Sequence, residues 1–206
     1  MSAAPPTKMS VVYVASTGHV VAAVTRSDTT SPSPSVADLV GDGIHLRMAT
    51  APTTSSGPVG TFVIPPSDLA SVDVDFDQVG TLPWARAINP PTASSTPGPA
   101  QPGVNSNLMA FPSAGLPTVN PASAGNPVNI SITIPTTVVI PPGSTYYIVF
   151  SQPATITGAL PKASGALSSS GPTVVQFPNL TFPSKGDYPV LILVPMMLPY
   201  VANLTV

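Results

Sequence analysis

Proline recurs through the whole chain and limits how long any regular segment can run. There are 29 prolines among 206 residues, and each one fixes φ and removes a backbone hydrogen-bond donor. Even the most apolar stretch, Tyr188–Val206, contains three of them and no charge. This stretch cannot form one long helix. We interpret it as two buried strands, Val190–Val194 and Tyr200–Val206, joined by a proline-bounded corner.

Charged side chains are scarce, which argues against helices as well. They make up 7% of the chain, whereas about 25% is typical of soluble domains. Glutamate is absent and lysine and arginine are few, although these are the residues that build exposed helix faces. Abundant Val, Ile, Thr, Ser and Pro favour short strands and turns. The sequence predicts an all-β protein.

Composition divides the chain into three regions. Residues 1–88 are predicted to form an N-terminal β module, residues 89–129 a Pro/Gly/Ser-rich extended arm or linker, and residues 130–206 a C-terminal β-sandwich. The middle region has few apolar residues and the composition of polyproline-like segments. We therefore expect two small β-sandwich-like modules joined by a long arm.

Two hairpins are predicted in the N-terminal module. Val11–Ala15 and Val20–Thr25 flank a short loop in which Gly18 can take a positive φ. Val36–Val40 and Ile44–Met48 flank Gly-Asp-Gly, a hairpin turn signal. The alternative for the first arm is a single helical turn, because it contains Ala37 and Asp38. Further strands are predicted at Thr61–Ile64 and Val72–Phe76.

Many short strands with regular punctuation are predicted in the C-terminal module, a pattern typical of sandwiches. The predicted strands are Ile130–Ile134, Val138–Ile140, Thr145–Phe150, Thr155–Gly158, Thr173–Gln176, Leu180–Phe182, Val190–Val194 and Tyr200–Val206.

Few residues are candidates for chemistry. His19 and His45 are the only histidines, with Asp42 three residues before His45. A His–Asp pair near a serine is the skeleton of a hydrolase, but the chain has no G-x-S-x-G elbow. We interpret both histidines as structural or surface residues and expect no enzyme, no catalytic residue and no cofactor.

Three carboxylates alternate along one predicted strand. Asp73, Asp75 and Asp77 share one face, opposite Val72, Val74 and Phe76. Such a row could ligate calcium, a cation that prefers oxygen, but the glycine and distal glutamate of the EF-hand loop are missing. Like charges along a strand also protect an exposed edge from pairing. We favour the edge interpretation and keep a metal site as the alternative.

Several apolar side chains are candidates for contacts with a partner. Trp84 is the only tryptophan and is an interface anchor, a sugar-stacking platform or a core residue. Other candidates lie on the arm and in the apolar C-terminal stretch, which some surface must cover: Leu108, Met109, Phe111, Met196, Met197 and Tyr200.

Charge and cysteine usage exclude several classes of function. A net charge of −2 with no Lys/Arg cluster gives no electrostatic footprint for nucleic acid or for an anionic membrane. The absence of cysteine rules out disulfides, thiolate metal sites and cysteine nucleophiles. The N-terminus lacks the pattern of a signal peptide, and no apolar run reaches the roughly 18 residues of a membrane helix.

These features together favour a protein that works by packing against others. We expect a non-enzymatic structural or accessory subunit of a large assembly, such as a viral particle or a phage-tail-like machine. Its partners would be copies of itself or a larger particle, assembled in the cytoplasm and then released from the cell. The alternative is a carbohydrate- or surface-binding β-sandwich. Exposed coplanar aromatic side chains over a shallow groove would distinguish that alternative.

Overall fold

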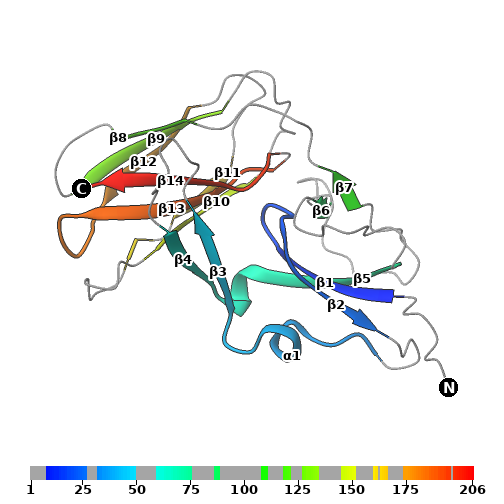
Figure 1. Ribbon diagram of the computed structural model, residues 1–206. Coiled ribbons are helices and arrows are strands. Elements are labelled where there is room, and N and C mark those ends of the chain that lie inside the picture. The colour runs from blue at the N-terminus through cyan, green and yellow to red at the C-terminus, as the bar shows by residue number, and fades with distance from the viewer. Residues whose placement is uncertain are drawn as a thin grey trace.

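The protein is all-β, as its sequence predicts. The computed structural model describes residues 8–26, 32–49, 59–75, 86–88, 108–110, 118–121, 127–134, 145–151, 160–161, 163–166, 174–195 and 197–206. Within these ranges the strands form antiparallel sheets of two to four strands, with one short α-helix and one 3₁₀ turn. Figure 1 shows the strands of the C-terminal part stacked at one end of the molecule and those of the N-terminal part at the other.

The N-terminal sheet is built around its first strand. β1 (Lys8–Val14) pairs antiparallel with both β2 (Val20–Arg26) and β5 (Leu69–Asp75), so the order is β2-β1-β5. In the turn that joins β1 to β2, Gly18 has a φ of 78°, which glycine adopts without a steric penalty. The predicted hairpin is thereby confirmed, with Gly18 in the expected role.

The second predicted hairpin is wrong. Val36–Val40 forms the helix α1, and its N-terminus is closed by a capping box in which the side chain of Ser35 and that of Asp38 each bond the other residue's backbone N–H. The turn glycine Gly41, with a φ of 61°, instead ends the helix, and its N–H donates to the Ala37 carbonyl. Reciprocal capping satisfies backbone donors that a hairpin would have used in a ladder.

The strand that follows finds a different partner. β3 (Ile44–Ala49) pairs antiparallel with β4 (Val59–Ile64), and a 3₁₀ turn (Pro66–Asp68) leads on to β5. A Cβ added at Gly60 of β4 would lie 2.6 Å from the Phe62 ring and 2.9 Å from Cβ of Pro189. Glycine is therefore needed at this point, where β4 crosses β13 (Asp187–Leu193).

Two sheets make up most of the C-terminal part. Their strand orders are β11-β10-β13-β14 and β12-β9-β8, and every neighbouring pair is antiparallel. The strands are β8 (Thr118–Pro121), β9 (Val128–Thr133), β10 (Thr145–Phe150), β11 (Ala163–Ala166), β12 (Val174–Leu180), β13 (Asp187–Leu193) and β14 (Tyr200–Thr205). A further short pair joins β6 (Arg86–Ile88) to β7 (Leu108–Ala110).

Three predicted C-terminal strands are found within two residues of their expected bounds, as β9, β10 and β14, and the predicted strand Val190–Val194 is found as β13, which begins three residues earlier. One difference lies in β12, which is a single strand with a register shift between Phe177 and Leu180, whereas we expected a second strand at Leu180–Phe182. Asn179 has a φ of 60° there, and its N–H is held by the Asn129 side chain at 2.8 Å. Predicted strands Val138–Ile140 and Thr155–Gly158 lie outside the described residues.

The central strand β13 is buried on both of its faces. Val190 and Ile192 belong to a hydrophobic cluster shared with β9, β10 and β12. Leu191 and Leu193 point the other way, into a cluster shared with β1, β3 and β4. In Figure 1 the sheet that contains β9 and β12 lies above β13, and the β3–β4 hairpin lies below it. Burial on both faces explains why this strand is continuously apolar.

Two kinds of contact join residues that the sequence assigns to different regions. The cluster below β13 combines residues from both predicted modules, for example Val12 and Phe62 with Leu191 and Val201. Strand β8, within the predicted arm, pairs with β9 of the C-terminal part. The division at residues 88 and 129 stays a prediction, since most of 89–129 lies outside the described residues.

Candidate interface site

An apolar pocket of about 520 Å³ lies where segments from the two ends of the chain meet. This volume falls in the range of roughly 300–1,000 Å³ that is common for binding pockets. Its walls come from β2, β3, β13 and the corner between β13 and β14. The lining residues are His19, Val20, Val21, Leu46, Arg47, Met48, Leu191, Leu193, Leu198 and Pro199.

The strand period of two explains why β13 supplies part of this pocket. Leu191 and Leu193 lie on the face of β13 that turns away from the other C-terminal sheet, and both are fully buried. Because alternate side chains of a strand point to opposite faces, one apolar strand serves both a core and a pocket wall. Leu46 and Met48 of β3 alternate in the same way and are partly buried against that cluster.

The corner between β13 and β14 carries the most exposed apolar residue of the pocket wall. Pro195 and Pro199 flank it, and the N–H of Met197 donates to the Val194 carbonyl at 3.1 Å. Met197 is buried in the C-terminal cluster at 1% exposure, whereas Leu198 is 45% exposed. The buried methionine anchors the corner, and the adjacent leucine is left at the edge of the pocket.

His19 ties the N-terminal hairpin to this corner. Its Nε2 lies 2.8 Å from the Met197 carbonyl oxygen and its Nδ1 lies 2.8 Å from the Thr17 hydroxyl. A carbonyl can only accept, so Nε2 carries the proton and Nδ1 accepts from Thr17. Burial lowers the pKa of His19 to about 4, against a smaller opposing effect of the Met197 bond. The ring is therefore neutral at physiological pH and serves as a structural link, not as a proton-transfer group.

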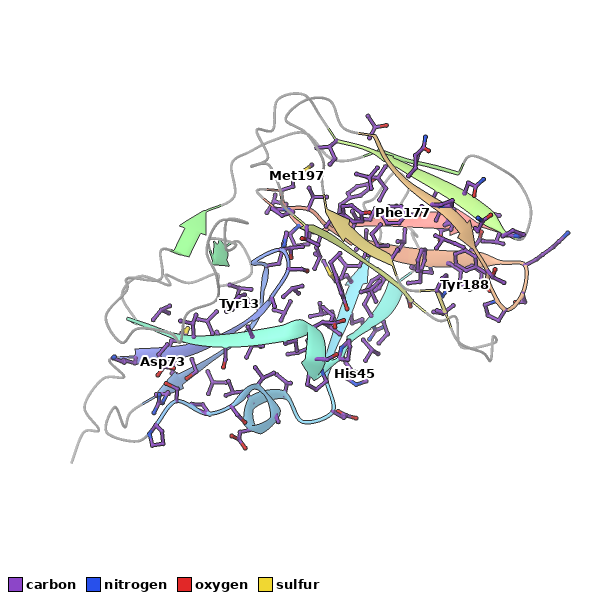
Figure 2. All side chains as sticks on the ribbon, turned by 180° about the vertical axis from the view of Figure 1, so that it is seen from behind. Tyr13, His45, Asp73, Phe177, Tyr188 and Met197 are labelled. Atoms are coloured by element: carbon purple, nitrogen blue, oxygen red, sulfur yellow. The ribbon has the colours of Figure 1, made fainter. Side chains whose placement is uncertain are left out.

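The second histidine lies apart from the first. His45 is exposed on β3, and Figure 2 shows it at the edge of the molecule, away from Met197. Asp42, in the segment between α1 and β3, is exposed too. Sequence reasoning placed both histidines in structural or surface positions but did not find the partner of His19, which is 178 residues away in the chain.

Of the predicted carboxylate row, the structure describes the side chain of Asp73. This carboxylate holds a polar cluster together. It accepts from Arg26 at 2.5 Å, from Ser10 at 2.6 Å and from Ser33 at 2.5 Å. Partial burial raises the pKa of Asp73, but the bonds from Ser10 and Ser33 and the charges of Arg26 and Lys8 outweigh it and hold the pKa below its usual value. Figure 2 shows Asp73 at the far end of the N-terminal sheet from Tyr188.

No metal site is found in the part of the chain that the structure describes, where no three His, Cys, Asp or Glu side chains gather closely enough to hold an ion. The side chain of Asp75 and all of Asp77 lie outside that part. β5 is an edge strand of its sheet, which is the position that the edge-protection interpretation requires.

The predicted contact residues fall into two groups. Met197 is buried and Tyr200 is partly buried against the C-terminal cluster, at the corner that borders the pocket. Leu108 and Met109 lie on β7, and their side chains are outside the described residues. Trp84, Phe111 and Met196 are outside them altogether, so their interface role stays a prediction.

Other acidic residues are engaged in bonds within the chain. Asp68 accepts from the Tyr147 hydroxyl at 2.6 Å, and Asp187 accepts from the Thr205 hydroxyl at 2.6 Å. Asp38 belongs to the capping box of α1.

Within the described residues, the pocket offers an aliphatic surface with one exposed charge, Arg47, at its wall.

Comparison with known proteins gives no relative for this chain. No protein-family model, no curated protein and no solved structure matches it. In the described part of the chain, no helix has the length and apolar character required to cross a membrane.

Proposed function

We propose that this protein is a non-enzymatic structural or accessory subunit of a large assembly and acts through contacts between copies of itself. The observation that carries this proposal is the pairing of an apolar pocket with an exposed leucine on its wall. Leu198 is 45% exposed and borders a cavity of about 520 Å³ whose other walls are mostly Val, Leu and Met.

A chain that carries both a protruding apolar side chain and an apolar pocket can pair with a second copy. In a two-fold interface the same patch serves on both subunits, so Leu198 of each copy would enter the pocket of the other. Full burial of an exposed leucine side chain contributes about 1.5–3 kcal/mol, and Leu198, which is 45% exposed in the single chain, would gain roughly half of that. Two such insertions provide the central anchors around which an interface forms.

The use of polar groups within the chain supports a structural role. His19 and the acids Asp38, Asp68, Asp73 and Asp187 all bond other parts of the same chain. These groups stabilise turns, strand ends and the hairpin link. The 7% charged content of the whole sequence also suits a subunit whose surface is covered by others, because interface cores are depleted in charge.

The assembly that fits these features is a viral particle or a phage-tail-like machine, built in the cytoplasm and released from the cell. Its partners are copies of this chain or the larger particle that incorporates it. Neither nucleic acid nor a membrane surface is proposed as a partner, because the net charge is −2.

Two matched charge substitutions test the contact. Leu198→Asp places a carboxylate at the pocket wall, whereas Val63→Asp places one at an equally exposed position, 46%, on β4 that does not line the pocket. Burying an unpaired charge is unfavourable, so we expect Leu198→Asp to weaken self-association at least tenfold, about 1.4 kcal/mol, and Val63→Asp to leave it intact. Sedimentation velocity over a concentration series measures both. Equal behaviour of the two variants would refute the pocket as the contact.

A further inference from the structure

We propose that a second pocket, of about 350 Å³, is a binding site for a neutral ligand rich in hydroxyl groups, such as a monosaccharide unit. The pocket lies between the β1–β2 turn, the 3₁₀ turn Pro66–Asp68 and strands β10 and β11. Its polar lining residues are Ser16, Ser67, Asp68, Thr145 and Tyr147, which together carry one carboxylate and four hydroxyl groups. This inference does not depend on the proposed assembly.

The carboxylate is held in a fixed position. The backbone N–H of Asp68 donates to the Pro65 carbonyl at 3.0 Å, and the Asp68 carbonyl accepts from Ala15 at 3.0 Å. Its side chain accepts from the Tyr147 hydroxyl at 2.6 Å and from the Ser67 hydroxyl at 3.2 Å. A carboxylate has about four acceptor positions, so those not used by these two bonds are open to hydroxyl groups of a ligand.

The tyrosine keeps its proton and so keeps the carboxylate in place. Burial, the hydrogen bond to Asp68 and the charge of Asp68 all raise the pKa of Tyr147. The hydroxyl therefore remains a donor throughout the physiological range. A protonated Tyr147 leaves Asp68 as an acceptor for a ligand, and its ring forms part of the wall.

One hydroxyl of the lining residues is not used by the protein itself. The Oγ of Ser16 is shielded from solvent and has no hydrogen-bond partner within the described residues, although it lines this pocket. Buried hydroxyls are nearly always bonded, to protein, water or ligand. Rotation of the Ser16 side chain about χ1 would turn this hydroxyl into the pocket, where it could both donate to and accept from a ligand hydroxyl.

The balance of groups favours a sugar over a cation. Calcium takes six to eight oxygen ligands, usually with several carboxylates, whereas this pocket holds one carboxylate that already accepts two hydrogen bonds. The remaining lining residues, Ala15, Ile148 and Ala163, are apolar and suit the C–H face of a sugar ring. Hydroxyl groups that both donate and accept match the serine and threonine hydroxyls better than an ammonium group, which only donates.

Saturation-transfer difference NMR on the full chain tests the site. The probes are D-glucose, D-galactose and D-mannose, with cyclohexanol as a ring that has a single hydroxyl and ethylammonium as a small cation. We expect saturable binding of at least one sugar and weaker binding of both controls. Ser16→Ala should weaken sugar binding roughly three- to tenfold, the effect of one neutral hydrogen bond, while the melting temperature stays the same or rises.

Two further variants make the result specific. Ala163→Leu narrows the cavity and should also weaken binding, whereas Ser184→Ala removes an exposed hydroxyl that does not line the pocket and should have no effect. Three outcomes would overturn the inference: no saturable binding of any of the three sugars, equal binding by wild type and Ser16→Ala, or preferred binding of cyclohexanol or ethylammonium. The first would mean that only water occupies the pocket.

Discussion

The two ends of the molecule are held together in different ways. Within the described residues, the cluster between the C-terminal sheets contains seventeen buried apolar side chains. The cluster at the far end of the N-terminal sheet contains four, Met9, Val11, Val20 and Val74, and beside it lies the polar cluster around Asp73. One end therefore depends on apolar burial, and the other depends on charge-assisted hydrogen bonds as well.

The two ends should therefore respond to different perturbations. Apolar burial is insensitive to pH and is not screened by salt, whereas attraction between partly exposed charges is reduced by salt. His19 combines both kinds of interaction. It is a polar group whose hydrogen bond links the two ends, and it is buried among apolar residues.

The largest effect is expected in the C-terminal cluster. Phe182 is 2% exposed and packs edge-on against Phe150, with ring centroids 5.1 Å apart, and against Tyr188 at 4.7 Å. Phe182→Ala should lower the free energy of unfolding by about 3–5 kcal/mol, the usual cost of such a cavity. Urea unfolding followed by circular dichroism measures it, and the loss should be the same at low and high salt. A loss below about 1 kcal/mol would show that this cluster is not the main source of stability.

The next effect is a loss of stability in acid. The pKa of His19 is about 4 in the fold and about 6.5 in an unfolded chain, so the unfolded chain binds the proton first. The free energy of unfolding is therefore highest at neutral pH and falls as the pH drops through 6.5. Near pH 4 it is about 3 kcal/mol lower than at neutral pH. Urea midpoints between pH 7 and pH 4 measure this slope.

Two histidine variants separate His19 from other titrating groups. His19→Gln can still donate to Met197 and accept from Thr17, but it does not titrate, so the slope between pH 6.5 and 4 should become shallow. His45→Gln, at an exposed position, should keep the wild-type slope. If His45→Gln flattened the slope and His19→Gln did not, the role assigned to His19 would be wrong.

The smallest of the three effects concerns the polar cluster. Asp73→Asn keeps the shape of the side chain but removes its charge, which breaks the ion pair between Asp73 and Arg26. We expect a loss of about 1–3 kcal/mol that is smaller in 1 M salt, where charges are screened within about 3 Å. Asp187→Asn, at an exposed strand end, is the matched control. A salt-independent loss would show that packing, not charge, holds this end together.

Much of the fold follows from local sequence signals. The sequence predicts the β1–β2 hairpin and the two separate strands β13 and β14, because apolar runs are bounded there by Gly18 or by prolines, which act through their own backbone geometry. The helix at Val36–Val40 is predicted only as an alternative, although its capping residues Ser35 and Asp38 form an S-x-x-D pattern that favours a helix start. Attention to that pattern would have given the correct element.

The pocket could not be predicted in the same way. It joins Val20, Leu46, Leu191 and Leu198, and which strands lie side by side is decided by packing between distant segments. The bond between His19 and Met197 depends on the same packing. Sequence reasoning did identify the C-terminal apolar stretch as a surface that needs a cover, and this stretch supplies one wall of the pocket and the corner that carries Leu198.

The most direct test of the proposed function is the mass of the wild-type protein in solution. Multi-angle light scattering on the purified full chain, with negative-stain imaging of the same sample, reports whether copies associate. Self-association through the Leu198 pocket predicts a dimer or a larger regular particle whose mass is a whole multiple of 20.8 kDa. A single species at 20.8 kDa across the accessible concentration range would contradict it.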